Sequence, residues 1–135
     1  MHSINGITKG TELEKTVNAV AQAEANGVMI YYALARLAQE QGLDDVSEKF
    51  IWIANQEAVH AGFYAVLNGK YPSDFWDFLE NFQRGEENAE NSLLPLAEKI
   101  SEMGHPEVAD VIRKFAAQEK NHGVILGEIL KKYRK

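Results

Sequence analysis

Two copies of one short motif, Glu-x-x-His, place the strongest constraint on this chain. The first copy pairs Glu57 with His60, and the second pairs Glu119 with His122, 62 residues later. Residues three apart lie on the same face of an α-helix, so each copy directs a carboxylate and an imidazole to one point. This donor pair suits iron, manganese or zinc better than calcium or magnesium. The motifs therefore predict a helical metal-binding protein.

The 62-residue offset extends beyond the motifs and predicts a duplicated helical hairpin. At this offset Glu24 matches Glu86, and Gly42 matches Gly104. Further matches are Asn26 with Asn88, Leu34 with Leu96, Ala54 with Ala116 and Gln56 with Gln118. In each half the first Glu lies 18 residues before the turn glycine and the second lies 15 residues after it. Both therefore sit at a similar height in an antiparallel pair of helices.

Apolar residues recur every three or four positions in four segments, which predicts four helices. We expect them at about residues 11–42, 44–69, 73–104 and 106–133, after a flexible arm at residues 1–10. Thr11, in a capping box with Glu14, and Ser73 are the expected N-caps. Pro95 is expected to bend the third helix. Residues 11–135 are thus expected to form one domain.

The inward faces of these helices carry only six Asp, Glu or His residues: Glu24, Glu57, His60, Glu86, Glu119 and His122. An unpaired carboxylate buried in a helical core costs several kcal/mol, so four of them need compensation. Two divalent cations balance the charge of four carboxylates, and neutral imidazoles add none. The pattern therefore predicts one dinuclear metal centre, formed where two hairpins face each other.

Composition excludes several other classes of site. The absence of cysteine removes disulfides, thiolate nucleophiles and cysteine-ligated iron or zinc. A net charge of −6 argues against a nucleic-acid-binding surface. No signal peptide and no apolar run long enough for a membrane span is present in the sequence. We therefore expect a soluble, cytoplasmic protein that binds neither nucleic acid nor membrane.

These residues resemble the ferritin-like di-iron carboxylate superfamily, whose bundles carry one Glu on each of two helices and Glu-x-x-His on the other two. The chain looks most like the erythrin domain of rubrerythrins, from about residue 11 to residue 133. Tyr31, seven residues after Glu24, keeps the spacing of that family, as do Gly85-Glu86 and Pro95. The resemblance implies an all-α, ferritin-like four-helix bundle with two iron ions that cycle between Fe²⁺ and Fe³⁺.

The resemblance also implies roles for individual residues. Glu57 and Glu119 would bridge the two metals, and the terminal ligands would be Glu24, His60, Glu86 and His122. Tyr31 would be the catalytic residue, through a hydrogen bond or an electron. The implied function is reduction of hydrogen peroxide or dioxygen in oxidative-stress defence. Because the rubredoxin domain of rubrerythrins is missing, an external protein would donate the electrons.

The chain departs from the rubrerythrin pattern close to the expected metal site. Rubrerythrins usually carry a further Glu at the position of Ala89, and a tyrosine at the position of Leu94. Glu90 points about 100° away from Ala89 on a regular helix, so it could replace the missing carboxylate only if the helix is distorted. The alternatives are therefore a ferroxidase or iron-handling protein, a dimanganese protein, or a largely structural metal-binding bundle, and zinc also remains open.

The short link between the two halves bears on assembly. In ferritin-like bundles the second and third helices run parallel, so the link must cross the length of the bundle. From Leu67 to Ser73 the gap is roughly 30 Å, whereas six extended residues reach only about 20 Å. Either residues 74–82 are not regular helix, or the second hairpin packs on a partner chain. We therefore predict a homodimer, domain-swapped so that each site draws ligands from both chains.

Overall fold

The computed structural model describes residues 2–135, which form five α-helices and no strand. The helices are α1 (Glu14–Glu40), α2 (Asp44–Leu67), α3 (Trp76–Asn88), α4 (Glu90–Glu102) and α5 (Pro106–Tyr133). None of the helices in this part of the chain has the length and apolar content that crossing a membrane requires. With α3 and α4 counted as one interrupted helix, the chain supplies the four helices of a ferritin-like bundle, and the all-α prediction is confirmed.

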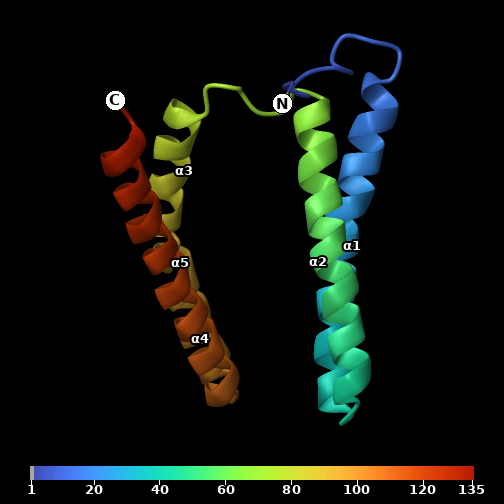
Figure 1. Ribbon diagram of the computed structural model, residues 1–135. Helices are drawn as coiled ribbons and strands as arrows, with labels where there is room; N and C mark the ends of the chain where they lie inside the picture. The colour runs from blue at the N-terminus through green and yellow to red at the C-terminus, as the bar shows by residue number, and fades with distance from the viewer. Residues whose placement is uncertain (1) are drawn as a thin grey trace. The chain divides into compact units, whose positions relative to one another are not determined.

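The chain divides into two compact units, one ending at Ser73 and the other beginning at Asp74. In the first hairpin, α1 and α2 lie side by side, and in the second hairpin α5 packs against both α3 and α4 (Figure 1). Both hairpins turn at a glycine with positive φ, 73° at Gly42 and 95° at Gly104. Such glycines end helices in the left-handed conformation at little steric cost. The predicted duplicated hairpin is therefore present.

Small residues hold each pair of helices together. The fully buried positions of the first hairpin include Ala35, Ser47 and Ala54, and 62 residues later Ala97, Ala109 and Ala116 are buried in the second hairpin. Small side chains allow two helix backbones to approach closely. Because the same positions are buried in both hairpins, the two copies use the same packing.

The third helix differs from the expected one at both its start and its middle. It begins at Trp76 rather than after Ser73, and its hydrogen bonding is interrupted at Ala89. There the Ala89 N–H donates to the Glu86 carbonyl three residues back, at 3.3 Å. Pro95 lies inside α4. A proline ring displaces the carbonyl four residues before it, which here is that of Asn91 in the first turn of α4.

The N-terminal segment, predicted as a flexible arm, is described from residue 2 and packs on the end of α2. The Thr8 N–H donates to the Leu67 carbonyl at 3.1 Å, and the Thr8 hydroxyl donates to the same carbonyl and to Asn68 Oδ1. These groups satisfy carbonyls that the end of a helix leaves unpaired. The chain then enters α1 at Glu14, with Leu13 rather than Thr11 at the N-cap position.

Candidate metal centre

The first hairpin brings together Glu24 from α1 with Glu57 and His60 from α2. Each residue offers a ligand atom, and these atoms lie within 4.8 Å of one another. His60 Nδ1 is 3.5 Å from Glu24 Oε2 and 3.9 Å from Glu57 Oε2. The Glu24 side chain is 21% exposed and the His60 side chain 54%. Three of the predicted ligands therefore lie together in the first hairpin.

The second hairpin repeats the arrangement with Glu86 from α3 and with Glu119 and His122 from α5. His122 Nδ1 lies 3.4 Å from Glu119 Oε2 and 3.7 Å from Glu86 Oε2. Again the ligand atoms lie within 4.8 Å of one another. The six predicted ligands therefore form two groups of three, one in each hairpin, with the same composition and similar spacing.

A glycine on α1 makes room for the first group. A Cβ added at Gly27 would lie 3.4 Å from Glu57 Cδ and 3.6 Å from Glu57 Oε1. The position 62 residues later is Ala89, where the second hairpin has its helix interruption. The residue three positions after the first Glu is therefore small in both hairpins. In the first hairpin this residue lies directly against a proposed ligand.

The carboxylates of the second group are close enough to share a proton. The hydrogen bond with Glu119 raises the pKa of Glu86, and desolvation and the negative charge of Glu119 add to this effect. The pKa of Glu119 is lowered, chiefly because of the same hydrogen bond. A pair of this kind holds one proton between two carboxyl groups. A bound cation would replace that proton.

The donor set fits a divalent transition metal. Each group offers two carboxylates and one imidazole, a mixture found at iron, manganese and zinc sites. In the first group Glu24 Oε2 is buried and has no hydrogen-bond partner. A buried carboxylate oxygen without a donor is costly, and a metal ion would satisfy it. The residues of each group therefore fit a bound divalent metal ion.

Other residues near the two groups have partners that the sequence did not reveal. The Tyr31 ring lies on α1 at 6.2 Å from the Phe50 ring, centroid to centroid.

Glu90 Oε1 lies 3.4 Å from Lys120 Nζ across α4 and α5. Glu90 therefore lies in an ion pair outside the group formed by Glu86, Glu119 and His122. No local pattern signals a pair whose members lie 30 residues apart.

Comparison with known proteins agrees with this geometry. The family model for rubrerythrin matches residues 15–74 and again residues 77–135, once for each hairpin. The uncharacterized protein MJ0746 of Methanocaldococcus jannaschii is 38% identical over 130 residues, covering 96% of this chain and 92% of that protein. Reverse rubrerythrin-1 of Clostridium acetobutylicum is 28% identical over 133 residues, covering 96% of this chain and 74% of that protein. The chain therefore belongs to the rubrerythrin family.

Proposed function

We propose that the two groups of ligands close on each other to form one dinuclear iron centre. The proposed ligands are Glu24, Glu57, His60, Glu86, Glu119 and His122. Four carboxylates balance the charge of two divalent cations, which removes the cost of placing them in a helical core. The observation that carries this proposal is the repetition of one Glu, Glu, His group in both hairpins. Manganese or zinc are the alternative metals for the same donor set.

The proposed activity is reduction of hydrogen peroxide or dioxygen by a non-haem di-iron oxidoreductase. When bound, iron supplies the electrons by cycling between its ferrous and ferric states. Glu57 and Glu119 would hold the two ions at a short separation, and the histidines would tune their potential. Tyr31, two helical turns from Glu24, is the proposed hydrogen-bond or electron donor. Residues 1–135 contain no cysteine that could hold a rubredoxin-type iron, and the proposed electron donor is an external protein.

Ala89 favours a second candidate, a ferroxidase that oxidises ferrous iron as its substrate. The carboxylate that rubrerythrins usually carry at this position is missing, and Glu90 pairs with Lys120. The remaining set of four Glu and two His is the set found in ferroxidase centres of the ferritin-like superfamily.

The link between the hairpins supports a homodimer in which each centre is completed by a partner chain. The 24 residues of α2 span about 36 Å. The eight residues 68–75 that separate α2 from α3 extend at most about 29 Å. Their first part is tied back to α2, because the Gly69 and Lys70 N–H groups donate to carbonyls of its last turn. A link this short favours exchange of the second hairpin between two chains.

Rapid mixing of the Fe²⁺-loaded protein with peroxide or with dioxygen tests the activity. For the peroxidase we expect faster oxidation by peroxide than by dioxygen. We also expect two bound iron ions for each pair of hairpins. Preference for dioxygen together with accumulation of many irons per chain would support the ferroxidase instead. If neither oxidant reacts faster with the protein-bound Fe²⁺ than with free Fe²⁺, both proposals fail.

Metal stoichiometry tests the ligands independently of turnover. Glu57→Ala is expected to lower the number of bound metal ions per chain, because it removes a ligand from the first group. Glu48→Ala, which truncates an exposed carboxylate on the same helix, is the matched control and should leave the stoichiometry unchanged. Equal metal content in the two variants would overturn the proposed site.

A further inference from the structure

A glutamine side chain joins α3 to α5 beside the second ligand group. Gln83 Nε2 donates to the Gly123 carbonyl at 3.2 Å and to Glu87 Oε1 at 2.6 Å. Gly123 directly follows the proposed ligand His122 in α5, and Glu87 directly follows the proposed ligand Glu86 in α3. This bridge therefore reaches each of the two helices at the residue next to a ligand.

The amide of Gln83 is held in one orientation. Both of its neighbours are acceptors, so the amide turns its NH₂ group toward them and uses both of its protons. Glycine at position 123 opens the backbone of α5 to this contact, because a Cβ there would lie 2.5 Å from Glu87 Cγ. A Cβ at Gly127 would lie 3.5 Å from Gln83 Nε2 itself. Two glycines on α5 thus let a glutamine of α3 reach the helix backbone.

The first hairpin lacks the residues that form this bridge. It has alanine at all four matching positions, Ala21, Ala25, Ala61 and Ala65. Alanine side chains have no hydrogen-bonding group, and an open depression of about 200 Å³ lies at this place, with the four alanines in its lining. The two hairpins share their other buried small residues but differ here.

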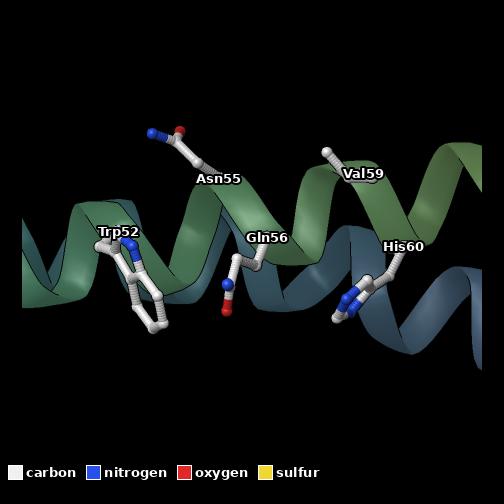
Figure 2. Close-up of a pocket in the computed structure, with 5 residues that line it drawn as sticks. All are labelled: Trp52, Asn55, Gln56, Val59 and His60. Carbon is white, nitrogen blue, oxygen red and sulfur yellow. The ribbon is translucent and has the colours of Figure 1, made fainter.

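The helices of the first hairpin are hydrogen-bonded to each other at another place. The Tyr32 hydroxyl of α1 donates to Asn55 Oδ1 of α2 at 2.7 Å. Figure 2 shows Asn55 and His60 projecting from opposite sides of α2. Tyr32 lies eight residues, or about 12 Å along the helix, from Glu24. This hydrogen bond therefore joins the helices away from the ligands, unlike the bridge in the second hairpin.

We propose that Gln83 is a positioning residue, which fixes α5 against α3 so that the donors of the second ligand group face one metal ion. The inference rests on the proposed metal centre. Glu86 comes from α3, whereas Glu119 and His122 come from α5, so their separation depends on how the two helices are held. A hydrogen bond to a backbone carbonyl restrains rotation and sliding of the helix, because the carbonyl belongs to a rigid peptide unit. Donors that are held in place before binding lose less conformational freedom when the ion binds.

Zinc binding followed by NMR tests this role. Zn²⁺ suits the donor set, and in a protein with isotope-labelled histidine the ring nitrogens of His60 and His122 report the two groups separately. Gln83→Met keeps the length and the neutral charge of the side chain but removes the N–H donors. The free Zn²⁺ concentration, buffered by a chelator, that half-saturates His122 should rise about 5-fold, the factor that one hydrogen bond contributes. The value for His60 should change by less than about twofold.

Gln22→Met, at an exposed glutamine of α1, is the matched control and should change neither value. An unchanged half-saturation of His122 in Gln83→Met would overturn the proposal. An equal rise for both histidines would also overturn it, because a general loss of stability affects both groups alike.

A second substitution separates positioning from charge. Gln83→Glu keeps the shape of the side chain, but at neutral pH it turns acceptors toward the Gly123 carbonyl and the Glu87 carboxylate. The added negative charge by itself attracts a cation, so a purely electrostatic role predicts tighter Zn²⁺ binding. The positioning role predicts weaker binding at His122. Tighter or unchanged binding would contradict it.

The same titration separates this inference from the proposed metal centre. If Zn²⁺ shifts neither His60 nor His122 in the unaltered protein, the proposed ligands are wrong and the role of Gln83 falls with them. If Zn²⁺ shifts both histidines and Gln83→Met behaves like the unaltered protein, the ligands stand and only the role of Gln83 is refuted.

Discussion

Replacing Gly123 by alanine tests how closely α3 and α5 must approach to build the second ligand group. A Cβ at Gly123 would lie 2.5 Å from Glu87 Cγ and 3.1 Å from the Glu87 backbone nitrogen. The side chain of Glu87 can turn away, but its backbone moves only with α3. Overpacking of this kind costs about 1–3 kcal/mol, and alanine in place of glycine in a helix returns about 0.5–1 kcal/mol. We expect a net loss of stability of about 1 kcal/mol.

Gly127→Ala is the matched control, one helical turn further along α5. Its Cβ would lie 3.5 Å from Gln83 Nε2, an ordinary contact, so this variant should gain about 0.5–1 kcal/mol. Urea unfolding of the metal-free protein should therefore separate the two variants by about 1–3 kcal/mol. If Gly123→Ala proves as stable as Gly127→Ala, the reasoning from the close approach is wrong.

A compensating change identifies the source of the loss. The first hairpin has Ala61 and Ala25 at the positions of Gly123 and Glu87, so an alanine pair fits the same helical contact. Glu87→Ala combined with Gly123→Ala should therefore recover most of the lost stability, as a favourable coupling in a double-mutant cycle. Because His122 precedes Gly123, the single variant should also bind metal more weakly, and the double variant should restore that affinity.

Three further predictions concern the ends of the chain and the metal. Thr8→Val removes the hydroxyl that donates to the Leu67 carbonyl and to Asn68 Oδ1 and should cost about 1–2 kcal/mol in thermal unfolding. A hydrogen bond from Arg134 lowers the pKa of Glu80 in the folded protein. The ionised Glu80 therefore stabilises the fold at a pH above its pKa in the unfolded chain. This contribution is lost as the pH falls through the pKa of Glu80 in the folded protein. In Arg134→Ala, the pKa of Glu80 measured by NMR should rise toward its ordinary value; no change would contradict the pairing. Chelation should lower the melting temperature of the metal-loaded protein, because a metal ion that binds only the folded state stabilises that state. Chelation should leave the melting temperature of Glu119→Ala unchanged, because this variant lacks a proposed ligand.

Local spacing was sufficient to predict the duplicated hairpin and the proximity of each Glu to the His three residues later. The i, i+3 relation of Glu57 and His60 follows from helix geometry, and the repeat carries the same relation to Glu119 and His122. Gly42 and Gly104 mark both turns because few other residues adopt positive φ at low cost. Glu24 and Glu86 are proposed as further ligands because each is the only charged residue on its inward face near that height.

Contacts between distant residues were decided only by the tertiary structure. The N-terminal segment packs on α2 through Thr8, whose partners lie 59 and 60 residues away. Glu90 is held by Lys120, 30 residues away, and the interruption at Ala89 accompanies a proline six residues downstream. Sequence periodicity reports only which face of a helix is apolar. It does not contain the distances between helices, and those distances decide which polar groups meet and where a side chain fits.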